Sequence, residues 1–195
     1  NSTPPADGDW KVLGWDAAGI VREVGPDVTQ FELGDEVYYA GSITRPGTNA
    51  EFHLVDARIV GHKPASLSWA EAAALPLTTL TAWEAMFDRL DVAKPVPGAA
   101  EAILIIGGAG GVGSIAVQIA RQRTDLTVIA TASRPETQEW VRGLGAHHVI
   151  DHSRPLAPQI AELGIGAPAF VFSTKHTEQH AADIAELIAP QGRFL

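Results

Sequence analysis

The chain has 195 residues, with 14 Lys and Arg against 23 Asp and Glu, a net charge of −9 and no cysteine. Without cysteine it can form neither a disulfide nor a thiolate zinc site, and its acidic balance argues against general nucleic-acid binding. The length allows one large domain or two small ones. Residues 1–9 carry no apolar segment typical of a signal peptide, so we expect a cytoplasmic protein.

The first part of the chain contains short runs of Val, Ile, Tyr and Phe separated by turn formers, a pattern typical of a small antiparallel β unit. The expected strands cover residues 18–24, 36–40 and 50–55. Ser68 and Glu71 then have the spacing of a capping box, which predicts that a helix begins there. Pro76 interrupts this helix, and residues 77–90 resume it as a connector between domains.

The second part alternates apolar strands with longer helical stretches. The expected strands cover residues 102–106, 127–131, 148–150 and 169–172. The expected helices between and after them cover residues 112–123, 136–144, 156–163 and 178–189. Repeated β-α-β units predict an α/β fold, in which a doubly wound parallel sheet is covered by helices on both faces.

An uncharged run over residues 102–120 reaches about the length of a membrane-spanning helix, but five glycines interrupt it. Because glycine weakens helices and favours turns, a buried strand, a glycine-rich turn and an apolar helix are the better interpretation. We therefore expect no membrane span.

The glycine-rich turn contains the pattern Gly108-x-Gly110-x-x-Gly113, a dinucleotide-binding fingerprint in the strand–turn–helix context that it requires. The first glycine would permit the tight turn, the second would admit a pyrophosphate, and the third would allow close helix packing. Gly111 and Val112, at the start of the helix, complete the expected phosphate site.

The end of the second strand of this sheet indicates which nicotinamide cofactor is bound. NAD-dependent enzymes usually place an acidic residue there, to bind the ribose hydroxyls, but here Ser133 and Arg134 follow the strand. A hydroxyl and a guanidinium suit a 2′-phosphate, which predicts NADPH. The alternative is that Ser133 and Glu136 form another capping box and that Arg134 is a solvated surface charge.

The chain resembles the medium-chain dehydrogenase/reductase superfamily, in particular its quinone oxidoreductase branch and the proteins called zinc-type alcohol dehydrogenase-like. The resemblance spans nearly all of the sequence and is carried by motifs in order. They are Gly14-Trp15-Asp16-Ala17-Ala18-Gly19, Val24-Gly25, Phe31-x-x-Gly34-Asp35-x-Val37, Ala73-Ala74-Leu75-Pro76, Leu80-Thr81-Ala82-Trp83, the run from Gly107 to Gly113, and Leu144-Gly145-Ala146.

This resemblance implies part of a GroES-like β-barrel domain over residues 1–75 and a Rossmann domain over residues 76–195. It implies a partial chain that lacks the opening barrel strands and the last Rossmann strands, and a homodimer joined through the Rossmann sheet. The implied reaction is hydride transfer from NADPH to a small-molecule quinone or activated alkene (enone).

The zinc-dependent relatives carry Gly-His-Glu where this chain has Gly14-Trp15-Asp16. An indole cannot ligate zinc, so we expect a zinc-independent enzyme with no metal site. Asp16 has a plain alternative role as a structural hydrogen-bond partner. The spacings of His148 with His152, and of His176 with His180, are not diagnostic of a metal site.

The resemblance also places individual residues at the site. Tyr39 aligns with a tyrosine that lines the family's cleft, where it would donate a hydrogen bond; packing inside the barrel is an equal alternative. Thr81 matches a position at the nicotinamide end, and its alternative is an ordinary helix hydroxyl. His152 would lie beside the adenosine, and Phe172 and Ser173 end a strand where open parallel sheets bind ligands.

Two other functions stay open. A zinc alcohol dehydrogenase is the enzymatic alternative, and a non-catalytic NADPH-binding protein is the other, since a fold does not fix a function.

Overall fold

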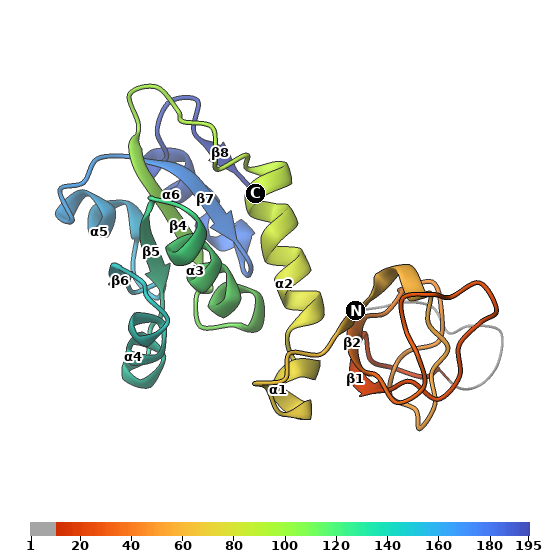
Figure 1. Ribbon diagram of the computed structural model, residues 1–195. Coiled ribbons are helices and arrows are strands. Elements are labelled where there is room, and N and C mark those ends of the chain that lie inside the picture. Colours follow the sequence, from red (N-terminus) through yellow and green to blue (C-terminus); the bar gives the residue numbers. More distant parts are fainter. Residues whose placement is uncertain (1–10) are drawn as a thin grey trace. The chain divides into compact units, whose positions relative to one another are not determined.

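The computed structural model describes residues 11–195, and the chain divides into two compact units, residues 1–78 and 79–195 (Figure 1). The segment on which the absence of a signal peptide was judged, residues 1–9, lies outside the described residues.

The first unit contains a three-stranded antiparallel sheet in the order β1-β2-β3. Its strands are β1 (Asp16–Ile20), β2 (Glu36–Ala40) and β3 (Val60–His62), with a short 3-10 helix, η1 (Ala57–Ile59), before the third. The prediction for β2 is confirmed. The strand predicted at 18–24 starts and ends earlier, because Val21 already bonds the turn around Gly34 and Asp35.

The strand predicted over residues 50–55 was wrong, since this segment is irregular and the third strand lies at β3 instead. The apolar residues that suggested a strand do not form a buried face: Phe52 is 71% and Leu54 is 78% exposed. The loop is tied to residues 12–14 by backbone hydrogen bonds from Gly47, Thr48 and Asn49.

The predicted capping box is confirmed at the start of α1 (Trp69–Ala73). The Ser68 hydroxyl accepts the backbone N–H of Glu71, while the Glu71 carboxylate accepts the backbone N–H of Ser68 at 2.9 Å. The next helix, α2 (Pro76–Trp83), opens on proline, which is tolerated at a helix start. It continues as one stretch of π-helix, η2 (Glu84–Arg89), which ends with Leu90 N–H bonding to the Ala85 carbonyl.

The second unit is built on a five-stranded parallel sheet in the order β6-β5-β4-β7-β8. The strands are β4 (Ala100–Ile106), β5 (Thr127–Thr131), β6 (His148–Ile150), β7 (Pro168–Ser173) and β8 (Arg193–Phe194). The first strand in sequence is central, and the winding reverses between β4 and β7. This topology confirms the predicted doubly wound Rossmann sheet.

Helices cover both faces of this sheet (Figure 1). They are α3 (Gly111–Arg123), α4 (Pro135–Gly143), α5 (Leu156–Glu162) and α6 (Thr177–Leu187). Successive residues of β4 point to opposite faces: Ile103 packs with α3 and α4, whereas Leu104 packs with α5 and α6. Both side chains are fully buried, so each face has its own core.

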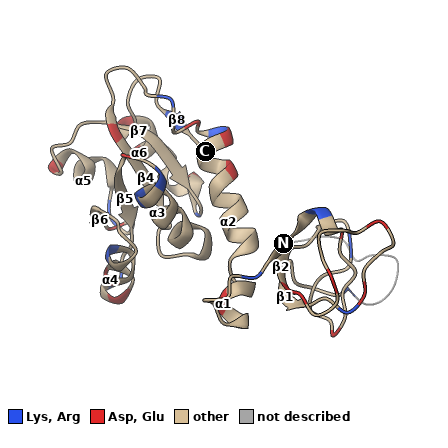
Figure 2. Cartoon of the chain, viewed as in Figure 1, with Lys and Arg blue, Asp and Glu red and all other residues tan. Residues whose placement is uncertain are grey.

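Two further expectations concern the surface and the apolar run. No helix within residues 11–195 is long and apolar enough to cross a membrane, and residues 102–120 form the end of β4, a turn and most of α3. Basic and acidic residues are interspersed along the described elements (Figure 2).

Candidate functional site

A glycine-rich turn joins β4 to α3 at the carboxyl edge of the parallel sheet. Gly107 adopts a left-handed conformation (φ 81°), its N–H donates to the Thr131 hydroxyl at 3.0 Å, and its carbonyl accepts the N–H of Gly110 at 3.0 Å. A left-handed residue is best served by glycine. The turn is therefore held from the end of the neighbouring strand β5.

The tight turn depends on a different glycine from the one predicted. The fingerprint assigned this task to Gly108, but the left-handed residue is Gly107, one position earlier. Gly108 is buried against β5, where an added Cβ would lie 2.8 Å from the Cβ of Ala130. The third fingerprint glycine, Gly113, packs α3 on the turn as predicted, since an added Cβ would lie 2.8 Å from the Cα of Gly108.

The first turn of α3 presents backbone N–H groups without intrahelical acceptors. Gly110 is the residue before the helix, so it has no side chain that could cap these groups, and the N–H of Ser114 is the first to bond back, at 2.8 Å to the Gly110 carbonyl. Gly110 and Gly111 are exposed, while Val112 is half-buried. A helix start of this kind attracts a phosphate through its N–H groups and its dipole.

Two residues that the sequence analysis did not single out link α3 to the glycine-rich turn and to α4. The Ser114 hydroxyl donates to the Gly108 carbonyl at 3.4 Å, and the indole N–H of Trp140 in α4 donates to that hydroxyl at 2.9 Å. The sequence carries no signal for this contact, because 26 residues separate the two side chains.

Ser133 and Arg134 follow β5 at the same edge of the sheet. Arg134 is the residue before α4, and its side chain is 71% exposed and paired with Glu136 at 3.1 Å. The alternative capping box of Ser133 with Glu136 was wrong, because the helix starts one residue later. Thr137 instead accepts the Arg134 N–H at 3.3 Å and donates to the Arg134 carbonyl at 2.9 Å.

The end of β7 lies next to the end of β4, at the point where the winding reverses. Ser173 is paired with Ile106 in register, and its hydroxyl is 2.9 Å from that of Thr177. Phe172 is only 5% exposed and is part of the core. The following residue, Thr174, donates its hydroxyl to the Ile106 carbonyl at 2.9 Å, a contact that the sequence analysis missed.

His152 lies in the turn after β6, and its Nδ1 atom is buried without a hydrogen-bond partner. Burial lowers the pKa of this imidazole, Asp151 opposes that shift, and His180, His176 and Lys175 add to it. The charged groups that act on His152 thus come from its own turn and from α6 with its preceding loop. Arg134 is not among them.

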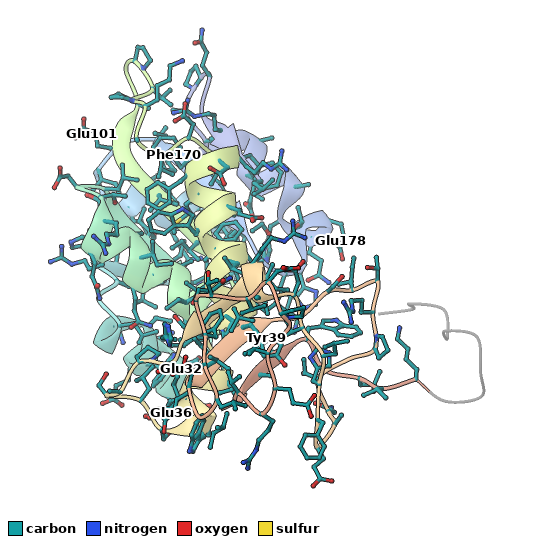
Figure 3. The ribbon with its side chains drawn as sticks, turned by 45° about the vertical axis from the view of Figure 1, so that its right-hand side comes forward. Glu32, Glu36, Tyr39, Glu101, Phe170 and Glu178 are labelled. Atoms are coloured by element: carbon teal, nitrogen blue, oxygen red, sulfur yellow. The ribbon has the colours of Figure 1, made fainter. Side chains whose placement is uncertain are left out.

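In the first unit, Tyr39 projects from β2 (Figure 3), and its side chain is buried, with 8% exposed. Its hydroxyl lies 2.8 Å from Nδ1 of His53, and the two rings are stacked with centroids 5.7 Å apart. Burial raises the pKa of Tyr39. Tyr39 is thus more buried than the adjacent Tyr38. Its hydroxyl also has a hydrogen-bond partner, His53, which the sequence analysis did not name.

Asp16 and Thr81 take local places in the structure. The Asp16 carboxylate accepts the backbone N–H of Leu77 at 2.6 Å, which confirms its structural role, and burial raises its pKa although that hydrogen bond opposes the shift. Thr81 is an exposed residue of α2 within the second unit.

The described residues do not fit a zinc site at the position used by zinc-dependent relatives. Trp15 is partly buried, and an indole offers only an N–H donor. Within residues 11–195, no three His, Cys, Asp or Glu side chains are grouped as a metal ion would need. The donor set at the glycine-rich turn, in contrast, fits a dinucleotide pyrophosphate.

A cavity of about 270 Å³ lies at the opposite edge of the parallel sheet, near the amino ends of its strands. Ala100, Leu126 and Ala169 are among the residues that line it. It lies at the far ends of the strands from the glycine-rich turn, so it takes no part in the site.

Comparison with known proteins covers both units. Residues 2–83 match the family described as alcohol dehydrogenase GroES-like domain, and residues 111–195 match the family described as zinc-binding dehydrogenase. A zinc-type alcohol dehydrogenase-like protein of Staphylococcus aureus (strain MSSA476) is 47% identical over 185 residues, which are 94% of this chain and 55% of that protein. The chain thus spans about half the length of the curated relatives that it matches.

Two solved structures are similar over nearly the whole chain. One is a protein of Rhizobium etli CFN 42 provisionally designated a zinc-dependent alcohol dehydrogenase, with 82% identity, a TM-score of 0.96 and coverage of 99% of this chain and 56% of that one. The other is the Escherichia coli quinone oxidoreductase complexed with NADPH, with 27% identity, a TM-score of 0.79 and coverage of 97% and 56%. The GroES-like match, the Rossmann sheet and these relatives show that the chain belongs to the medium-chain dehydrogenase/reductase superfamily.

Proposed function

We propose that this protein is an NADPH-dependent, zinc-independent oxidoreductase that transfers a hydride to a quinone or to the activated alkene of an enone. The observation that carries the proposal is the strand–turn–helix unit in which the uncapped start of α3 follows a turn built from glycine. The similarity to a quinone oxidoreductase that binds NADPH supports it.

The residues of the second unit have separate roles in holding the cofactor. The N–H groups of Gly111, Val112 and Gly113 bind the pyrophosphate, with Gly110 leaving room for its approach and Gly108 packing the turn against β5. Ser133 and Arg134 bind the 2′-phosphate, for which Arg134 must exchange its contact with Glu136. The remaining proposed contacts are His152 beside the adenosine, Thr81 at the nicotinamide end, and Phe172 and Ser173 at the end of β7.

Reduction needs a hydride and then a proton. NADPH, when bound, would supply the hydride for the β-carbon of the enone, and the substrate would then carry the negative charge of an enolate. A hydrogen-bond donor stabilises that charge in place of a metal. Tyr39 is the proposed donor, because its hydroxyl is hydrogen-bonded and its neighbour His53 is a second proton-carrying group. Trp15 supports the proposal that no zinc takes part, since its indole offers no lone pair to a metal.

A paired fluorescence titration with NADPH and NADH tests the cofactor assignment. We expect tighter NADPH binding, and Arg134→Ala should weaken NADPH binding about tenfold, the lower end for a charge-assisted contact because Arg134 is exposed. NADH binding should not change. The matched control is Arg142→Ala, which removes an exposed arginine from the last turn of the same helix. Equal binding of both cofactors would refute the role of Ser133 and Arg134.

Turnover tests the reaction itself. We expect oxidation of NADPH by enones and quinones, with full activity after dialysis against a chelator. Activity lost on chelation and restored by Zn²⁺ would instead establish the zinc alcohol dehydrogenase, and tight NADPH binding without turnover would establish a non-catalytic binding protein. Light scattering tests the homodimer, which is also a proposal.

A further inference from the structure

The hydrogen bonds of His53 fix which of its ring nitrogens carries a proton. Its Nε2 atom lies 3.1 Å from the Pro46 carbonyl oxygen, which can only accept, so Nε2 must carry hydrogen. In the neutral ring Nδ1 is then a bare acceptor, 2.8 Å from the Tyr39 hydroxyl oxygen. The hydroxyl hydrogen of Tyr39 therefore points at His53 whenever this imidazole is neutral.

Protonation of the ring reverses this hydrogen bond. The imidazolium keeps its Nε2–H on Pro46, and its new Nδ1–H donates to the Tyr39 oxygen. Because that oxygen now accepts, the hydroxyl hydrogen of Tyr39 is released to point elsewhere. One proton on His53 thus decides whether Tyr39 is a donor to the protein or to a bound molecule.

The loop that carries Pro46 and His53 is held in place independently of this pair. Gly47 N–H bonds the Val12 carbonyl at 2.9 Å, Thr48 N–H bonds the Gly14 carbonyl at 2.9 Å, and Thr48 Oγ1 bonds the Asp16 carbonyl at 2.7 Å. Tyr39 is held by β2, which is paired on both sides by β1 and β3. The two rings are preorganised, with only 14° between their planes.

Among the titratable groups near His53, Tyr39 is the one placed to exchange a proton with the ring. Tyr39 is the titratable group that faces the ring from β2, and within residues 11–195 no carboxylate makes an ion pair with His53. The charged residues of its own loop are Arg45, Glu51 and Asp56, and Asp56 is paired with Arg58 at 2.6 Å.

We propose that His53 is a positioning residue that directs the Tyr39 hydroxyl and resupplies its proton during the reduction. This rests on the proposed function. After the hydride reaches the β-carbon and the alkene electron pair becomes an enolate, the Tyr39 O–H bond breaks and its proton forms a bond to the α-carbon. The Nδ1–H bond of His53 breaks in turn to restore the Tyr39 hydroxyl. Solvent then returns a proton to His53, and the products are a saturated ketone and the oxidised cofactor.

The first test reads the ring itself, without cofactor or turnover. In the ¹⁵N-labelled protein, long-range ¹H–¹⁵N NMR distinguishes the two nitrogens, and the His53→Gln variant identifies the signals. We expect the neutral ring to carry hydrogen on Nε2 and the Nδ1 chemical shift to change in Tyr39→Phe but not in Tyr38→Phe, the matched change on the same strand. A neutral ring protonated on Nδ1, or one that does not respond to Tyr39→Phe, overturns the proposal.

The second test is the pH profile of kcat with NADPH and an enone. In the unchanged protein, kcat should fall as pH rises through the titration of His53 seen by NMR. His53→Gln keeps an acceptor for Tyr39 but cannot supply the proton, so we expect kcat to fall about 10²-fold and lose this pH dependence, with KM unchanged. Added imidazole should partly rescue His53→Ala. The control His62→Gln removes an exposed histidine of β3 and should leave the profile as it is.

The two tests separate failure of the inference from failure of the proposed function. Normal turnover in which His53→Gln keeps the original pH profile overturns the positioning role alone. Absence of NADPH oxidation by every enone and quinone in the unchanged protein overturns the proposed function and the relay with it. In that case the NMR result still shows whether His53 controls the Tyr39 hydroxyl.

Discussion

The contact between Gly113 and the turn before it gives the sharpest test of the cofactor site. In Gly113→Ala, the new Cβ would lie 2.8 Å from the Gly107 carbonyl carbon and 2.8 Å from the Gly108 Cα. Ordinary carbon contacts are about 3.5–4.0 Å, so α3 and the turn must separate by roughly 1 Å. Both neighbours are backbone atoms, which cannot move aside as a side chain can.

The expected cost follows from two opposing effects. Overpacking of this kind costs about 1–3 kcal/mol, while alanine gains about 1 kcal/mol over glycine inside a helix. We therefore expect a net loss of about 0–2 kcal/mol in the free energy of unfolding by urea denaturation. NADPH binding should weaken by about 10- to 100-fold, because the N–H groups that bind phosphate move with the helix start.

Gly143→Ala is the matched control, because Gly143 also lies in a helix but an added Cβ there meets no atom within 4 Å. We expect this variant to be about 0.5–1 kcal/mol more stable and to bind NADPH normally. A Gly113→Ala variant with unchanged NADPH affinity would refute the phosphate site at α3, and a stabilised one would refute the close packing.

Three further predictions concern stability. Ser68→Ala removes the cap of α1 and should lower the free energy of unfolding by about 1 kcal/mol in urea, whereas Ser66→Ala in the preceding turn should not. Leu104→Ala empties a fully buried site and should cost about 2–5 kcal/mol; a loss below 1 kcal/mol would contradict the described core. Burial raises the pKa of Asp16, so its charged form disfavours folding, and this penalty disappears as pH falls through the raised pKa. Asp16→Asn, which keeps an acceptor for Leu77, should be more stable than the unchanged protein at neutral pH, with the difference vanishing at acid pH in denaturation series.

The secondary structure of the second unit could be predicted well from the sequence, and that of the first unit only in part. Strands β5 and β6 match their predicted bounds, because runs such as Thr127–Thr131 are apolar on both faces and bounded by helices. The strand predicted at residues 50–55 failed because short apolar runs do not show what they pack against. Leu54 in this segment is 78% exposed. The backbone of residues 47–49, which precede the segment, is hydrogen-bonded to residues 12–14 and not to a sheet partner.

The sequence by itself determined the glycine fingerprint, the capping box at Ser68 and the position of Ser133 and Arg134 after the second strand, because each of these depends on residues close together in the chain. Only the tertiary structure decided that Gly107 makes the left-handed turn, that Trp140 holds Ser114, and that Tyr39 shares a hydrogen bond with His53. These contacts join residues up to 26 positions apart, and no local pattern specifies which loop or strand folds back to meet them. Burial and hydrogen-bond direction arise from that folding, and they decide how the Tyr39 hydroxyl points.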